Sequence, residues 1–437
     1  MRLIHTSDWH LGKTLCDRTR YDEHEAFLHW LSAYLIKEEI DCLVIAGDIF
    51  DTTTPSHQAL SLYFQFLHKI ASKANTSVVI TGGNHDSPTL LHAPKSFLRE
   101  FQIHVIGAAS ESHDDEVIPI YRDEKLCGII CAVPYLRERD LTALNPCEDA
   151  ETREERVKQQ LYSHYQKVYS HAIQVRQQNQ VSSLLPIIGM GHLFTKGGTA
   201  GDGVRSLYLG DICHIGTEQF PPFDYLALGH LHRHQIIGRD KTKQYSGAPI
   251  PMGFSEATNR QYILDVQVTG EMLHVEPIEI PREVEIMKIM GDIDQIQSQI
   301  FEHKVKGEKI LAEVVYTGTA SQPNLAKTVR DWVDGSLLSV IRIVDGTMYS
   351  TSSGICIEDT NSSNETNETL LSISKKRLEG LNEEYVFSTL LEKRGVESSR
   401  REALWNVYRQ LCTEVYERDS RAGTSTHNKK DEKGGFV

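Results

Sequence analysis

Cysteine is scarce in this sequence, and no two cysteines form a closely spaced pair. The eight cysteines are scattered over 437 residues, and there is no Cys-x-x-Cys motif. This spacing argues against a disulfide-stapled scaffold and against a cysteine zinc site. It favours a reducing compartment, and we therefore predict a cytoplasmic protein.

Long apolar runs and an excess of basic charge are also missing. No apolar stretch approaches the roughly 18 residues that a membrane-spanning helix needs. The N-terminus, MRLIHTSDWH, becomes polar too early for a signal peptide, so we expect no membrane association. The formal net charge of −14 excludes a protein that binds DNA only as a polycation.

The first part of the chain, residues 1–281, alternates short apolar runs with amphipathic segments. The apolar, β-branched runs predict strands at residues 3–4, 43–46, 78–81, 187–189 and 226–228. Helical spacing of apolar residues, or a long charged stretch, predicts helices at residues 21–39, 55–74 and 151–179. This alternation is typical of an α/β fold in which helices cover a layered sheet.

The rest of the chain has a different character. Residues 282–349 follow a β-α-β-α-β order, which predicts a small separate α+β domain. Residues 350–369 are rich in Ser, Thr and Asn and are interpreted as a linker. Two amphipathic helices are predicted within residues 370–418, and the tail at 419–437 has the composition of a disordered segment.

Five short polar motifs each follow an apolar run. They are Asp8-Trp9-His10, Gly47-Asp48-Ile49-Phe50-Asp51, Gly83-Asn84-His85-Asp86, Gly191-His192 and Gly229-His230-Leu231-His232. The carboxyl ends of strands in α/β sheets are where ligands bind, so these motifs are expected to meet. Residues at i and i+2 of a strand share a face, so Asp8 and His10 should reach one point, as should His230 and His232.

The motifs supply a mixed set of metal ligands. One Asp or His at a strand end is usually a turn residue, but five such motifs in series favour a metal site. The candidates are two aspartates, four histidines and one asparagine: Asp8, His10, Asp48, Asn84, His192, His230 and His232. Seven ligands are too many for one tetrahedral zinc and fit two metals that share a carboxylate. Carboxylate, imidazole and amide ligands suit manganese or iron, and a metal pair suits phosphoryl displacement.

The motif series resembles that of the calcineurin-like metallophosphoesterases, namely D-x-H, G-D-x-x-D, G-N-H-D, G-H and G-H-x-H. Three longer stretches further resemble its SbcD branch, the bacterial double-strand-break repair nucleases. They are GNHDSP at 83–88, FPPFDYLALGHLHRHQIIG at 220–238 and SGAPIPMGF at 246–254. The resemblance implies a metallophosphoesterase β-sandwich flanked by helices over residues 1–281. It also implies a capping domain at 282–349.

The resemblance also implies a role for each motif residue. One metal would be held by Asp8, His10, Asp48 and His232, and the other by Asp48, Asn84, His192 and His230. Both metals would be Mn²⁺, with Asp48 and a nucleophilic water between them. His85 would contact the scissile phosphate, as a transition-state stabiliser or as a general acid. Asp51 would orient His85 by a hydrogen bond, or would simply be a residue of a helix N-terminal turn.

The preferred interpretation is the nuclease subunit of a DNA repair, recombination and replication complex, with exonuclease and endonuclease action on DNA ends and hairpins. Helices in 370–418 would dock on an SbcC-type ABC ATPase, and a homodimer would form a two-plus-two complex. Arginines in predicted loops are candidate DNA contacts: Arg18, Arg20, Arg137 and Arg139. Two alternatives remain open: a phosphodiesterase or phosphatase of the same fold that acts on a non-DNA substrate, and a scaffold with an incidental metal site.

Overall fold

The computed structural model describes residues 1–110, 112–141, 150–179, 184–199, 215–319, 322 and 324–345. These residues belong to one compact unit, Met1–Gly354. The predicted linker at 350–369, the C-terminal helices at 370–418 and the tail at 419–437 lie outside the described residues, so they stay predictions.

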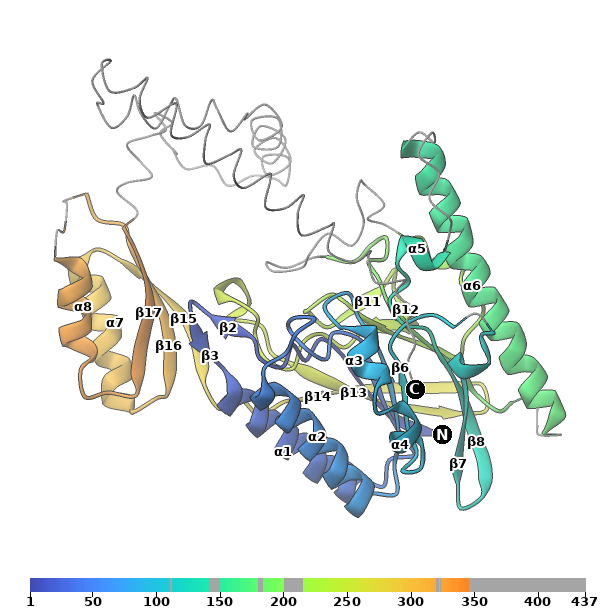
Figure 1. The fold of residues 1–437 in the computed structure, drawn as a ribbon. Helices are drawn as coiled ribbons and strands as arrows, with labels where there is room; N and C mark the ends of the chain where they lie inside the picture. Colours follow the sequence, from blue (N-terminus) through green and yellow to red (C-terminus); the bar gives the residue numbers. More distant parts are fainter. Residues whose placement is uncertain are drawn as a thin grey trace, which may run out of the picture. The chain divides into compact units, whose positions relative to one another are not determined.

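Two six-stranded sheets form the centre of the described structure (Figure 1). The first sheet has, in spatial order, β14 (Met272–Glu279), β13 (Tyr262–Thr269), β1 (Arg2–Thr6), β4 (Cys42–Ala46), β5 (Ser77–Thr81) and β6 (Ile103–Ile106). The second has β11 (Gln235–Ile237), β12 (Asp240–Tyr245), β10 (Tyr225–Gly229), β9 (Ile187–His192), β8 (Lys125–Ala132) and β7 (Val117–Arg122). The central pairs β1–β4–β5 and β8–β9–β10 are parallel, so their carboxyl ends point the same way within each sheet.

The central strands have buried apolar side chains on both faces of each sheet. Leu3, Val44 and Val79 of the first sheet belong to the core between the sheets, together with Ile130 and Ile188 of the second. The residues that alternate with them face the helices, which is why these strands read as continuous apolar runs.

Helices cover the outer faces of the two sheets. The first sheet packs against α1 (Tyr21–Lys37) and α2 (His57–Lys73), and the second against α6 (Ala150–Gln178). The side chain of Ser56 caps α2 by accepting a hydrogen bond from the main-chain nitrogen of Ala59. The shorter elements are β2 (Thr14–Leu15), β3 (Arg18–Thr19), α3 (Pro88–His92), α4 (Lys95–Arg99), α5 (Glu138–Leu141) and the 3-10 turns η1 (Asp114–Glu116), η2 (Thr217–Gln219) and η3 (Phe254–Glu256).

A third, parallel sheet follows the sandwich. Its order is β15 (Glu285–Gly291), β16 (Ile310–Tyr316) and β17 (Leu338–Asp345), connected by α7 (Ile293–Lys306) and α8 (Leu325–Val333). Ile296 and Ile300 of α7 and Val329 of α8 pack on one face of this sheet. We call residues 282–345 the cap. The predicted architecture, a layered α/β sandwich flanked by helices and followed by a small domain of strands and helices, is confirmed, while the domain boundaries stay predictions.

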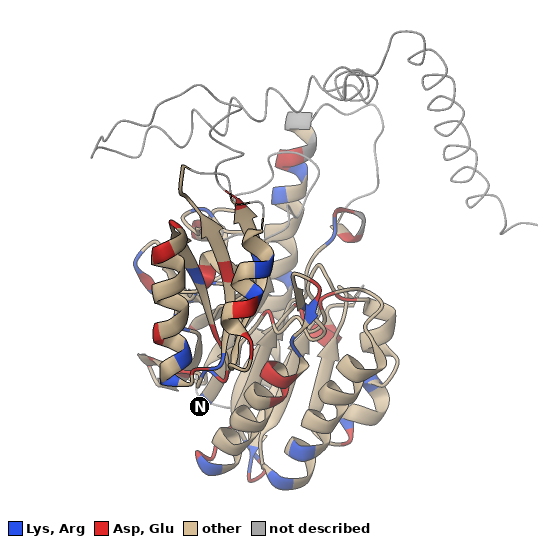
Figure 2. Cartoon of the chain, turned by 90° about the vertical axis from the view of Figure 1, so that its left-hand side faces the viewer, with Lys and Arg blue, Asp and Glu red and all other residues tan. Residues whose placement is uncertain are grey.

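On the side of the molecule that carries α7 and α8, acidic and basic positions are interspersed (Figure 2). None of the helices in the described ranges has the length and hydropathy needed to cross a membrane.

Candidate metal centre

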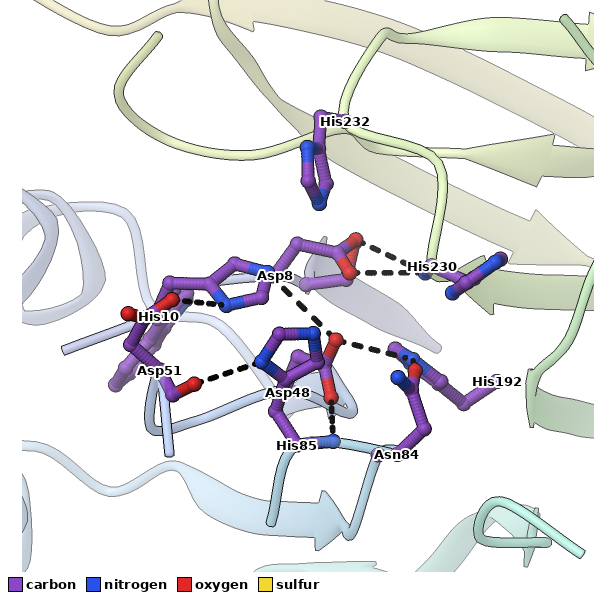
Figure 3. A network of polar contacts seen from close by, with 12 residues as sticks. Asp8, His10, Asp48, Asp51, Asn84, His85, His192, His230 and His232 are labelled. Atoms are coloured by element: carbon purple, nitrogen blue, oxygen red, sulfur yellow. Dashed lines mark hydrogen bonds and ion pairs between the residues drawn. The ribbon is translucent and has the colours of Figure 1, made fainter. Parts of the chain in front are cut away.

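The five polar motifs meet at the carboxyl ends of β1, β4, β5, β9 and β10. The carboxylates of Asp8 and Asp48 lie in the middle of the cluster (Figure 3). The other candidate ligands and His85 surround them: His10 and His85 on one side, Asn84, His192 and His230 on the other, and His232 above. Both sheets therefore contribute to one site.

The backbone at these motifs is not the extended strand that the sequence predicts. β1 ends at Thr6 and β10 at Gly229, so the Asp8–His10 and His230–His232 pairs do not lie on strands. Instead, Asp8, His10, Asp48 and His230 have positive φ angles of 54°, 45°, 52° and 103°. The expectation that i and i+2 strand geometry brings these pairs together was wrong. Left-handed turns bring them together, and such strained backbone is common at functional sites.

Gly83 permits the close approach of two loops. A Cβ at this position would overlap both the carboxylate and the main-chain nitrogen of Asp48. The main chain of the β5 loop therefore lies directly against the central carboxylate of the site, which only glycine allows.

Replacing Gly83 with alanine should displace Asp48. We expect a loss of about 1–3 kcal/mol in the free energy of unfolding, because the overlapping atoms include main chain. Metal affinity should fall by about 10-fold or more, as measured by calorimetry. Gly253→Ala is the matched control, because a Cβ there has its nearest neighbour, Ser255 Oγ, at 4.0 Å. Wild-type affinity in Gly83→Ala would contradict this packing.

Six of the candidate ligands form two neighbouring groups. Asp8, His10 and His232 have potential ligand atoms within 4.8 Å of one another, and so do Asp48, His192 and His230. Asp48 Oδ2 lies 3.3 Å from His192 Nε2 and 3.6 Å from His10 Nε2. The Asn84 side-chain oxygen lies 2.9 Å from His192 Nε2. Asp48 thus stands between the two groups, as a bridging carboxylate must.

Unsatisfied buried nitrogens indicate that the site fits cations. Both ring nitrogens of His10 are buried without a hydrogen bond to any described residue. Buried polar atoms normally have a partner, and exceptions mark functional groups or bound ions. His192 differs from His10 because its Nδ1 has a hydrogen-bond partner. This nitrogen lies 3.0 Å from the main-chain oxygen of Ala46. A carbonyl can only accept, so Nδ1 carries a proton, and Nε2 faces Asp48.

The carboxylates and imidazoles of the site shift one another's pKa values. Burial alone would raise the pKa of Asp48, but His192 and His10 hold it well below its usual range. Burial alone would lower the pKa of His192, but the Asp48 carboxylate raises it to about 9. Burial, together with the charge of His192, lowers the pKa of His230. Positive charge is therefore stabilised beside Asp48, where a cation would also be stabilised.

Asp86 organises the two loops that carry Asp48 and Asn84. Its buried carboxylate accepts hydrogen bonds from the main-chain nitrogens of Ile49, Phe50 and Gly83 at 3.1, 3.0 and 2.8 Å. Burial and the nearby Asp48 charge raise the pKa of Asp86 to about 6. Asp86 stands in the Gly-Asn-His-Asp motif, but its type and spacing alone gave no sign of this role.

The hydrogen bond between Asp51 and His85 involves the main chain of Asp51. His85 Nδ1 lies 2.7 Å from the main-chain oxygen of Asp51, not from its carboxylate. The carboxylate instead lies 3.4 Å from His10 Nδ1 and 3.0 Å from Lys13 Nζ. Any orienting effect of Asp51 on His85 would therefore act through the backbone.

Arg20 does not fit the expectation of a DNA contact. Its side chain is buried, pairs with Glu23 and donates to the main-chain oxygen of Pro251. It therefore fixes the start of α1 against a distant loop. The side chain of Arg139 lies outside the described residues.

Comparisons with known proteins agree with this geometry. The calcineurin-like phosphoesterase family matches residues 1–234. The SbcD subunit of the SbcCD nuclease from Escherichia coli (strain K12) is 34% identical over 301 residues, which cover 69% of this chain and 73% of that protein. The corresponding protein of Rhodobacter capsulatus is 33% identical over 300 residues, or 66% and 71% of the two chains. That of Bacillus subtilis is 34% identical over 263 residues, or 59% and 63%.

Among solved structures, a dimetal phosphatase from Danio rerio aligns with 64% of this chain and 99% of its own, at 12% identity and a TM-score of 0.37. The family match covers more than half of the chain, and two of the nuclease subunits exceed 30% identity over more than two thirds of their length. The chain belongs to the calcineurin-like phosphoesterases and, within them, to the family of SbcD nuclease subunits.

Proposed function

We propose that this protein is the metal-dependent nuclease subunit of an SbcCD-type complex that hydrolyses DNA phosphodiesters at ends and hairpins during repair and recombination. The observation that carries the proposal is the convergence of six other ligand residues around Asp48, all of them buried except the half-buried Asn84, in a chain of this family. The cysteine pattern favours the cytoplasm as its compartment.

The two groups of ligands would each hold one divalent cation, for which we propose Mn²⁺. Asp8, His10 and His232 would hold one, and Asn84, His192 and His230 the other, with Asp48 shared. When bound, the cation pair would activate a water molecule and stabilise charge on the phosphate oxygens. The oxygen and imidazole donors of this chain fit such a cation better than a soft metal.

His85 would act on the phosphate from beside the cluster. Its Nδ1 must carry a proton, because a main-chain carbonyl at 2.7 Å can only accept. We propose that Asp51 positions His85 through this carbonyl and so turns Nε2 towards the substrate. In its protonated form, Nε2 can donate to a phosphate oxygen or to the leaving oxygen. His85 is only 6% exposed, which limits competition from bulk water.

We propose that the cap contributes contacts to DNA. Ile286 and Leu311 of its sheet pack against Leu15 and Phe254 of the sandwich. On that sheet, Lys288 and Arg342 lie 3.4 and 3.2 Å from the buried Glu313. We propose that this cationic pair lines a groove for the DNA backbone.

The substrate class can be tested directly. The purified chain should digest linear duplex DNA in Mn²⁺ and lose this activity with a chelator. Bis-p-nitrophenyl phosphate is the small-diester comparison, and each reaction is run with and without the ATPase. Cleavage of the small diester without any cleavage of DNA, even with the ATPase, would favour the non-DNA alternative. Hydrolysis of neither substrate would favour the scaffold alternative.

The partner assignment rests on the C-terminal sequence. We propose that the predicted helices at 370–418 bind an SbcC-type ABC ATPase, and that a homodimer of this chain forms a two-plus-two complex with it. An amphipathic helix that binds in a groove needs apolar anchors at helical spacing, and the sequence supplies Leu404, Val407, Tyr408, Leu411 and Val415.

A chain that ends near Thr360 should keep Mn²⁺-dependent nuclease activity and lose the ATPase. The reason is that all seven ligands and His85 precede residue 233. Leu404→Glu combined with Leu411→Glu should have the same effect, because a buried charge at an interface is costly. Co-purification with the ATPase measures both effects. The matched control, Asn406→Glu with Gln410→Glu, alters the opposite helical face and should still bind. Equal binding by the leucine double variant would place the interface elsewhere.

A further inference from the structure

A carboxylate outside the five motifs faces the outer nitrogen of His232. Glu256 Oε1 lies 3.7 Å from His232 Nδ1, and both side chains are buried, with 6% and 5% of their surface exposed. His232 Nδ1 makes no hydrogen bond to any described residue, and Glu256 is the carboxylate that faces it at ion-pair distance. The ring of His232 points towards Asp8 and the centre of the cluster (Figure 3). Glu256 therefore lies behind His232, on the side away from the site.

The position of Glu256 is fixed by the turn that carries it. Its second oxygen, Oε2, accepts a hydrogen bond from the main-chain nitrogen of Met252 at 2.8 Å. The preceding residue, Pro251, is held through its main-chain oxygen by the buried Arg20. One carboxylate oxygen is thus used to close the 252–256 turn, and the other remains for His232.

The same turn packs against the cap. Phe254 packs in one cluster with Val284, Ile286 and Leu311. The side chain of Arg282 donates a hydrogen bond to the main-chain oxygen of Ala257 at 3.0 Å. The η3 turn therefore has an apolar side against the cap and an acidic side against His232, so it cannot shift without disturbing both.

We propose that Glu256 is a positioning residue that orients His232 for metal binding from the turn that seats the cap. A carboxylate behind a ligand histidine accepts its outer N–H, fixes the tautomer and makes the inner nitrogen a stronger donor. This role rests on the proposed function, because it assumes a cation at Asp8, His10, Asp48 and His232. It assigns a role to a residue that lies 24 positions beyond the last ligand motif.

The test is a Mn²⁺ titration of Glu256→Gln by calorimetry. Glutamine keeps an oxygen that can accept from Met252 but removes the negative charge behind His232. We expect affinity at one of the two sites to fall by about 10–100-fold. The affinity of the other site and the melting temperature of the metal-free protein should not change. Glu276→Gln, on the exposed face of β14, is the matched control and should bind as the wild type does.

Conservative rescue separates positioning from a merely structural role. Glu256→Asp keeps the charge and should recover part of the affinity that Glu256→Gln loses. Wild-type affinity at both sites in Glu256→Gln would overturn the proposal. So would an equal weakening of both sites together with a lower melting temperature. If the wild type itself binds fewer than two Mn²⁺ ions, the two-metal function fails first, and this outcome is visible before any variant is compared.

Discussion

Replacing His85 with alanine should lower the rate of hydrolysis by about 10²–10⁴-fold while two Mn²⁺ ions remain bound. The side chain contacts the main-chain oxygen of Asp51 and belongs beside the cluster rather than within it. Its main-chain nitrogen donates to Asp48 Oδ1 at 2.9 Å, and alanine preserves that hydrogen bond. The Asp48 carboxylate should therefore stay in place, and the defect should appear in kcat on DNA.

Metal content distinguishes this role from that of a ligand. The structure places His10, Asp51 and His85 close enough to hold an ion together, so a direct ligand role is a real alternative. Calorimetry on His85→Ala that shows one Mn²⁺ site lost would prove the assignment wrong. His57→Ala is the matched control, because His57 is exposed at the start of α2 and should keep full activity.

Asp48→Asn should damage the site more than any other ligand change. Asp48 is the carboxylate within 4.0 Å of both His10 and His192, and it stands between the two ligand groups. Asparagine removes the negative charge that offsets the repulsion between two adjacent cations. We expect at least one Mn²⁺ to be lost in calorimetry or elemental analysis, with no measurable hydrolysis.

The backbone conformation at position 48 accommodates the Asp48→Asn substitution. Asp48 has a φ of 52°, and asparagine tolerates the left-handed region as well as aspartate does. Asp123→Asn is the matched control, since Asp123 is exposed and has a φ of 48°. Two Mn²⁺ ions bound at wild-type affinity in Asp48→Asn would contradict the bridging role.

The central strands and the location of the site could be predicted from the sequence. The runs at 43–46 and 78–81 coincide with the buried strands β4 and β5, because parallel strands buried on both faces are continuously apolar. The polar motifs directly after such runs indicate one ligand-binding edge. By contrast, the edge strand β14 is largely exposed, so its apolar pattern is weak and did not predict it.

The supporting residues could not be predicted in the same way. Asp86 and Glu256 act through contacts with Ile49 and His232, which lie far from them in the sequence. The Gly-Asn-His-Asp motif contains Asp86 but does not indicate these contacts, and no motif contains Glu256. Arg20 is an arginine before a helix, which suggests a surface position until its contacts with an acidic side chain and a distant main-chain oxygen are known. Glycine and asparagine are the residues that most clearly indicate a left-handed turn, and neither stands at position 8 or 10.

The most direct measurement is anomalous diffraction from crystals of the wild-type protein soaked in Mn²⁺. We expect two adjacent anomalous peaks in the cluster, with Asp48 in contact with both. Asp8, His10 and His232 should contact one peak, and Asn84, His192 and His230 the other. A single peak, or two peaks that do not share Asp48, would contradict the proposal that Asp48 bridges two metal ions.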